Sequence, residues 1–212
     1  MCKQPRSTII PDLVTRGSHG GPPLQILLLI LSLSCLCSCQ QKVSQNNANT
    51  TAAPSPEASV EKINLTSSAF VEGGAIPAQY TCDGANISPP LAWSNLPSNT
   101  KAIALVVDDP DAPLKTWVHW VVYDLPPTTT QLPENVKGGD TLPGGGKQGT
   151  NDFRKVNYGG PCPPSGTHRY YFKLYALDTE TSLKVGANQD DLLNAMDGHI
   201  LARGELMGTY KR

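Results

Sequence analysis

The chain has no excess of positive charge, and this excludes one broad class of partner. Lys and Arg together number 17 and Asp and Glu number 18, so the net charge at pH 7 is -1. A protein that binds nucleic acid needs a clearly basic face to neutralise phosphates. We therefore expect no nucleic-acid partner.

The sequence also has no apolar run of the length that a membrane-spanning helix needs. The apolar stretch from Ile26 to Leu33 falls well short of the ~20 residues of such a helix and is typical of a signal-peptide core. In the Leu-Cys-Ser-Cys that follows, Cys39 best fits the lipidated cysteine of a bacterial lipoprotein, and an ordinary secretory signal is the alternative. The sequence predicts a leader at 1–39, a polar tether at 40–61 and a domain at 62–212, anchored outside the cytoplasm.

Helical patterns are scarce as well. Gly and Pro number 19 each, and Val, Thr, Tyr and Trp gather in short runs. This composition favours short strands joined by turns, and we expect a mostly β domain with one or two short helices. The expected strands lie at 63–70, 102–107, 117–125, 169–177 and 200–207, the helix at 188–197 with Asn188 as its N-cap, and a long surface loop at 133–149.

Several motifs of catalytic and metal sites do not occur. The chain has no His-x-x-x-His, no Cys-x-x-Cys and no Gly-x-Ser-x-Gly, so we expect no metal, no cofactor and no enzyme activity. Four of the six cysteines lie in or before the leader, which leaves Cys82 and Cys162 in the domain. In an exported protein this pair favours a disulfide, and two free thiols are the alternative.

Two segments hold the chemistry that is present. Residues 109–113 read Asp-Pro-Asp-Ala-Pro and residues 117–120 read Trp-Val-His-Trp; residues 158–161 read Tyr-Gly-Gly-Pro and residues 167–170 read Thr-His-Arg-Tyr. The prolines indicate that Asp109 and Asp111 lie in a rigid turn rather than in a strand.

The strand period assigns the remaining side chains to faces. Residues two apart look the same way, so His168 and Tyr170 share a face and Arg169 points to the other. In the same way, Trp117 and His119 share a face that Trp120 does not.

Imidazole and phenol groups are donors suited to phosphate or carboxylate oxygens, and backbone N–H groups of a Gly-Gly turn add more. An aspartate beside them can orient a histidine and favour its doubly protonated form. The set therefore predicts an anion pocket. Taken singly, each residue has an ordinary structural explanation: Asp109 and Asp111 could cap turns, Tyr170 and the tryptophans could be core, and Arg169 could pair with Asp111.

The two motifs together resemble the phosphatidylethanolamine-binding protein family, and more narrowly its bacterial Raf-kinase-inhibitor-like branch. Residues 83–93, the Asn-Asp-Phe at 151–153 and the Gly-Thr-Tyr at 208–210 extend the resemblance to about 63–212. It implies a β-sandwich-like domain on a large central antiparallel sheet, with a small pocket for phosphate-type anions or phospholipid head groups. The pocket residues would be Asp109, His119, His168 and Tyr170, with Gly160 and Pro161 as a loop wall and Asp111, Arg169 and Trp117 in support.

Family members are also described as inhibitors of kinases or serine proteases. The leader argues against a kinase partner, because an exported domain does not meet cytoplasmic kinases. The function expected from the sequence is a membrane-tethered binding module. The alternative is an inhibitor of a secreted or envelope serine protease or other hydrolase, which would act through loops such as 133–149.

Overall fold

The computed structural model describes residues 61–142 and 144–212. The expected leader, its lipidated Cys39 and the tether up to residue 60 lie outside the described residues. Over the ranges that are described, no helix is long and apolar enough to cross a membrane.

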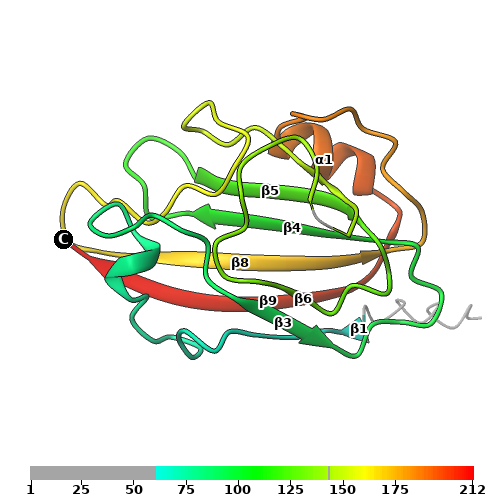
Figure 1. Cartoon of the computed structure of the whole chain (residues 1–212), viewed down its shortest axis with the longest axis horizontal. Coiled ribbons are helices and arrows are strands. Elements are labelled where there is room, and N and C mark those ends of the chain that lie inside the picture. The colour runs from blue at the N-terminus through cyan, green and yellow to red at the C-terminus, as the bar shows by residue number, and fades with distance from the viewer. Residues whose placement is uncertain (1–60, 143) are drawn as a thin grey trace, which may run out of the picture. The chain divides into compact units, whose positions relative to one another are not determined.

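Strands in the described part form a six-stranded and a three-stranded sheet (Figure 1). The large sheet has the order β1-β9-β8-β4-β5-β7 and the small one the order β2-β3-β6. The strands are β1 Glu61–Lys62, β2 Asn64–Thr66, β3 Leu91–Ser94, β4 Ala102–Asp109, β5 Trp117–Leu125, β6 Gln131–Leu132, β7 Lys147–Gln148, β8 Thr167–Leu177 and β9 Ile200–Lys211.

The mostly β class is confirmed, and the expected large antiparallel central sheet is confirmed in part. β1 pairs with β9 in parallel, whereas the other neighbours in that sheet are antiparallel. The large sheet is therefore mixed. The parallel pair is only two residues long, too short to leave a pattern in the sequence.

The expected helix is confirmed. Helix α1 spans Gln189–Met196, and the Asn188 side chain accepts a hydrogen bond from the Asp191 backbone N–H. The Asp191 side chain accepts in turn from the Asn188 N–H, which completes a capping box. A 3-10 helix, η1 at Ala78–Tyr80, adds one further short turn.

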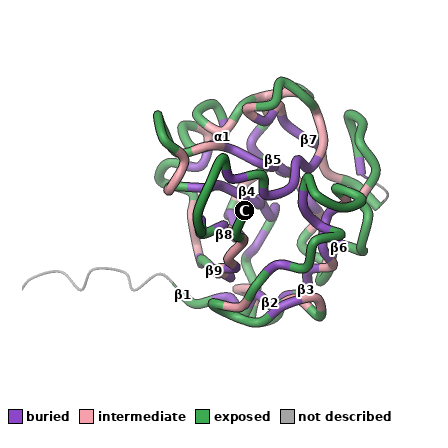
Figure 2. Tube along the Cα trace, turned by 90° about the vertical axis from the view of Figure 1, so that its left-hand side faces the viewer, coloured by how far each residue is buried: buried purple, intermediate pink, exposed green. Residues whose placement is uncertain are grey.

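Each face of the large sheet carries its own apolar core. Ile103, Leu105 and Val107 of β4 face the small sheet, where they join residues such as Trp93. The alternate residues of β4, such as Val106, pack instead with Leu192 and Met196 of α1. β4 is buried on both faces, and buried segments concentrate along it and β5 in Figure 2. A strand covered on both sides is rigid, which suits it to position a site at its end.

The structure differs from the sequence expectations at two places. Asp109 is the last residue of β4 and pairs with Trp117 of β5, so only Asp111 lies in the turn. Pro110 ends the strand after Asp109 rather than excluding Asp109 from it. The segment 133–149 is not simply a surface loop, because it contains β7 and the fully buried Gln148.

Candidate functional site

Antiparallel pairing brings the two motifs together at one end of the large sheet. β4 runs against both β5 and β8, so the last residue of β4 lies beside the first residues of its two neighbours. This is the end at which β9 also finishes, near the label C in Figure 1. The four predicted pocket residues are almost inaccessible, with exposed fractions from 0% for Tyr170 to 7% for His168.

Asp109 orients His168. The Nδ1 atom of His168 lies 2.7 Å from Oδ2 of Asp109 and donates to it. The other oxygen, Oδ1, accepts the Asp111 backbone N–H over 2.8 Å. Both carboxylate oxygens are therefore occupied, which holds the His168 ring in one orientation with its Nε2 atom free of this bond.

His119 is held by the Gly-Gly loop. Its Nδ1 atom lies 2.6 Å from the carbonyl oxygen of Gly159, which can only accept, so Nδ1 carries the proton. Burial lowers the pKa of His119, and the Gly159 carbonyl and the Asp109 charge offset only part of this effect. The ring is therefore neutral at neutral pH and offers Nε2 as an acceptor.

A β-bulge changes the face assignment within β5. Val107 of β4 pairs with Trp120 and Asp108 pairs with Val118, so His119 is the extra residue. His119 contacts Tyr170 edge to face, and Trp120 lies in the same core cluster as Tyr170. The expectation that Trp120 points away from His119 is therefore wrong, because strict alternation fails at a bulge.

The Tyr170 side chain brings a buried hydroxyl to the site. Its ring meets that of His119 at a centroid distance of 5.2 Å, and its hydroxyl oxygen is buried with no hydrogen bond. Burial raises the pKa of Tyr170, and the neighbouring Asp109 charge raises it further, so the phenol stays protonated. The Asp109 carboxylate and the Cys162 backbone influence this pKa, yet neither meets hydrogen-bond geometry with the hydroxyl.

The loop at 158–162 forms a wall that is clamped to the segment after η1. Asn86 Oδ1 accepts the Gly160 N–H over 2.7 Å, and Pro161 O accepts the Cys82 N–H over 3.0 Å. A Cβ at Gly160 would clash with the Tyr80 carbonyl, so a larger residue does not fit there. The structure also joins Cys82 and Cys162 in a disulfide, with a Cα–Cα distance of 5.4 Å.

The supporting residues take up positions around this centre. Arg169 points to the opposite face of β8 and binds Asp111 in bidentate fashion, at 2.7 Å and 2.9 Å. This pairing lowers the pKa of Asp111 to about 2. Trp117 lies on the His119 side and packs edge to face on Phe153, with a centroid distance of 5.5 Å.

Sequence reasoning did not single out Phe153 or Asn86. Phe153 also packs edge to face on the His119 ring, with a centroid distance of 5.4 Å, and so helps to position that ring. Its only signal was its place in the Asn-Asp-Phe of the family resemblance. Asn86 has a φ of 56° and therefore suits a tight turn, but nothing in the sequence pairs it with Gly160.

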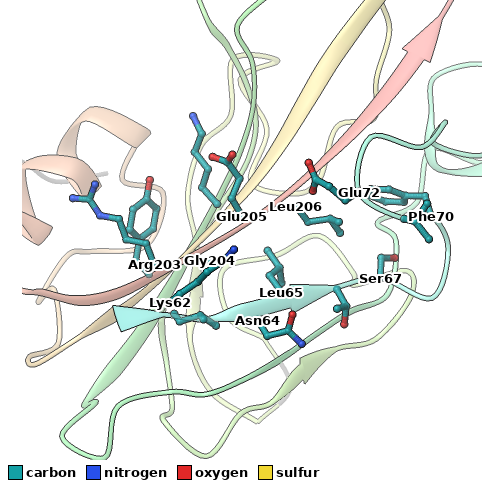
Figure 3. A pocket seen from close by; sticks show the side chains of 15 residues that line it. Lys62, Asn64, Leu65, Ser67, Phe70, Glu72, Arg203, Gly204, Glu205 and Leu206 are labelled. Carbon is teal, nitrogen blue, oxygen red and sulfur yellow. The ribbon is translucent and has the colours of Figure 1, made fainter. Parts of the chain in front are cut away.

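A separate groove lies elsewhere. It has a volume of about 960 Å³, is lined by residues of β2, β8 and β9, and contains none of the predicted site residues (Figure 3). Two of the charged side chains that line this groove already have partners, since Lys173 binds Asp108 at 2.7 Å and Glu72 accepts the Met207 N–H. We therefore take the buried cluster around Tyr170, rather than this groove, as the candidate site.

Metal ligands do not gather at this site. No group of three or more His, Cys, Asp or Glu side chains that could hold a metal ion occurs in the residues the structure describes. The Asp109–His168 pair and His119 are arranged instead with a phenol and a glycine loop. Such a set suits an oxygen-rich ligand that both donates and accepts hydrogen bonds.

Together, these residues form a mostly β domain with a mixed central sheet and a buried cluster of His, Asp and Tyr side chains at one end of that sheet. Residues 66–211 match the family model described as "Phosphatidylethanolamine-binding protein". Since this covers more than half of the chain, the protein belongs to the phosphatidylethanolamine-binding protein family.

Relatives and solved structures agree with this assignment. A UPF0098 protein of Methanothermobacter thermautotrophicus is 53% identical over 150 residues, which is 71% of this chain and 99% of the relative. A UPF0098 protein of Pyrococcus horikoshii is 46% identical over 72% of this chain and 79% of its own length.

Two crystal structures have similar folds. A phosphatidylethanolamine-binding protein homologue from Chlamydia trachomatis has a TM-score of 0.66 at 43% identity, covering 72% of this chain and 99% of its own. YbcL of E. coli, described as a member of the mammalian PEBP family, has a TM-score of 0.65 at 35% identity, covering 71% and 99%.

Proposed function

We propose that this protein binds a phosphate-type anion, free or as a phospholipid head group, at the site formed by Asp109, His119, His168 and Tyr170. The observation that carries the proposal is the Tyr170 hydroxyl, which is buried and has no hydrogen-bond partner. An unpaired buried hydroxyl costs about 1–3 kcal/mol, and a ligand oxygen would recover this.

The remaining groups complement such a ligand. His168 is oriented by Asp109 and, when doubly protonated, donates from Nε2. His119 is neutral and offers an acceptor, which suits a protonated phosphate oxygen or an ammonium group. The site thus combines donors and acceptors, as the two ends of a phosphoethanolamine molecule require.

Isothermal titration calorimetry tests the proposal with three probes: inorganic phosphate, phosphoethanolamine and glycerophosphoethanolamine. We expect binding to the wild type and a loss of about tenfold or more in His168→Ala. His199→Ala is the matched control, because His199 forms a similar 2.8 Å bond to Asp178 but is exposed and distant in the fold. Equal affinity in both variants, or no binding of any probe to the wild type, would refute the proposal.

The three probes also separate the sources of the phosphate. Binding of inorganic phosphate alone would point to a free anion, whereas a preference for glycerophosphoethanolamine would point to a lipid head group. We further propose binding without turnover, so phosphoethanolamine should be recovered unchanged after long incubation with the protein. Release of ethanolamine or of inorganic phosphate would show an enzyme instead.

We also propose that the domain is tethered to a membrane through lipidated Cys39. The support is the apolar run at 26–33 followed by Leu-Cys-Ser-Cys. Metabolic labelling with a palmitate analogue should mark the wild type and not Cys39→Ala in a bacterial host. Equal labelling of the two, or none of the wild type, would exclude lipidation at this residue.

A further inference from the structure

The disulfide between Cys82 and Cys162 is exposed and lies at the wall of the candidate site. Both cysteines line a small cavity of about 100 Å³, together with Gly159 and Gly160 of the wall loop. Both are also exposed in the folded chain, so a small thiol can reach the sulfur atoms. Access is the first requirement for thiol–disulfide exchange.

The surroundings of the two sulfur atoms differ. The Arg212 guanidinium places Nη1 3.5 Å from Cys162 Sγ, and its Nη2 lies 3.1 Å from a carboxylate oxygen of Asp83. A cation and an N–H donor therefore stand at one sulfur, while Asp83 follows the other cysteine directly in sequence. A thiolate is stabilised by a neighbouring cation and destabilised by a neighbouring carboxylate.

We propose that this disulfide is a thiol-exchange site with a fixed direction. The thiolate of a small thiol, such as glutathione, attacks Cys82 Sγ and forms a mixed disulfide there. The electron pair of the original S–S bond leaves on Cys162 Sγ, which becomes a thiolate beside Arg212. Exchange is faster when the sulfur that leaves belongs to the thiol of lower pKa. The Arg212 cation stabilises the thiolate of Cys162, so Cys162 is the leaving group.

Exchange at this position acts on the candidate site. The backbone between Gly160 and Cys162 is the site wall, and the Cys162 backbone is among the groups that influence the pKa of the Tyr170 phenol. After exchange, the wall would be held to the segment after η1 by hydrogen bonds alone, such as Gly160 N–H to Asn86 and Cys82 N–H to Pro161. The mixed disulfide should therefore weaken anion binding, and this second half of the inference rests on the proposed function.

The experiment uses the full chain with Cys2→Ser, Cys35→Ser, Cys37→Ser and Cys39→Ser, which leaves only Cys82 and Cys162 of the six cysteines. The protein is treated with glutathione and trapped in acid, and peptide mapping locates the adduct. We expect the adduct on Cys82. A predominant adduct on Cys162 would overturn the proposal.

The rate of exchange tests the role of Arg212. Arg212→Met should slow the reaction about two- to fivefold, since the cation is exposed and shares its charge with Asp83. Lys211→Met is the matched control, because it removes the same charge one residue away and should leave the rate unchanged. Equal rates in the two variants would also overturn the proposal.

Binding of phosphoethanolamine then tests the coupling. The oxidised protein should bind it about fivefold or more tightly than the glutathione adduct, and saturating phosphoethanolamine should disfavour adduct formation by the same factor. Equal affinity of the two forms would refute the coupling. If neither form binds, the proposed function fails, while the position of the adduct still decides the exchange site.

Discussion

The Nδ1 atom of His168 donates to Oδ2 of Asp109 over 2.7 Å, although the two residues are 59 positions apart in sequence. Asp109 ends β4 and His168 stands at the second position of β8. The bond links the two motifs across neighbouring strands, and both side chains are buried. The orientation of the His168 ring in the site therefore depends on this pair.

Replacing Asp109 should affect stability and binding together. In Asp109→Asn, the hydrogen bond to His168 loses its charge and one acceptor, so we expect a loss of about 1–3 kcal/mol in the free energy of unfolding and weaker phosphoethanolamine binding. Asp108→Asn is the control, because Asp108 points to the other face and binds Lys173. Denaturant titration and calorimetry measure both effects, and equal losses of affinity in the two variants would contradict the assignment.

Tyr170→Phe should separate binding from stability. The hydroxyl has no partner in the folded protein, so its removal should not lower the free energy of unfolding and should raise it by up to about 1–3 kcal/mol. The affinity for phosphoethanolamine should nevertheless fall about 10- to 100-fold, the value of a hydrogen bond to a charged group. Tyr171→Phe, on the opposite face of β8, should bind as the wild type does. Unchanged affinity in Tyr170→Phe would remove the central support of the proposed function.

The lowered pKa of His119 predicts a loss of stability in acid. The unfolded chain takes up a proton on this residue near pH 6.5, whereas the folded protein takes it up only at lower pH. Between these values the unfolded state binds more protons, so the free energy of unfolding falls as the pH drops below about 6.5.

The slope for this one group reaches at most about 1.4 kcal/mol per pH unit. His119→Gln should reduce the pH dependence by up to that amount. Urea titrations of the wild type and the variant at several pH values between 7.5 and 5 give the slopes. An unchanged slope in the variant would show that His119 does not contribute.

The clamp on the wall loop can be tested with two asparagines of similar backbone conformation. Asn86 and Asn95 have φ values of 56° and 65°, which glycine adopts readily. Asn86→Gly removes the acceptor of the buried Gly160 N–H, so it should cost about 1–3 kcal/mol more than Asn95→Gly. Thermal or denaturant unfolding provides the comparison, and equal effects of the two variants would show that the hydrogen bond contributes nothing.

The strands and the helix were largely predictable because their signals are local. The apolar run at 102–107 and the segment at 117–125 contain enough buried side chains to identify them, and Asn188 with Asp191 marks the start of α1. The parallel pairing of β1 with β9 was not predictable, since two residues have no periodicity of their own. Pairing partners depend on contacts between residues far apart in the chain.

At the site, too, the features with a local signal were predictable and those that depend on long-range contacts were not. Alternation along β8 correctly separated His168 and Tyr170 from Arg169, because β8 is regular at this end. Along β5 the same reasoning misplaced Trp120, because the bulge at His119 depends on the register with β4. Phe153 was missed for a related reason, since a loop residue reaches the His119 ring only in the folded chain.

The sequence by itself determined the mostly β class, the family and the residue types that could bind an anion, because each follows from local composition or short motifs. Only the tertiary structure decided which of these groups have partners. In the folded chain, both carboxylate oxygens of Asp109 accept hydrogen bonds and His119 carries its proton on Nδ1. The Tyr170 hydroxyl is buried without a hydrogen bond. These outcomes depend on distances between strands and loops that are remote in sequence, and a hydrogen bond forms or fails over a few tenths of an ångström.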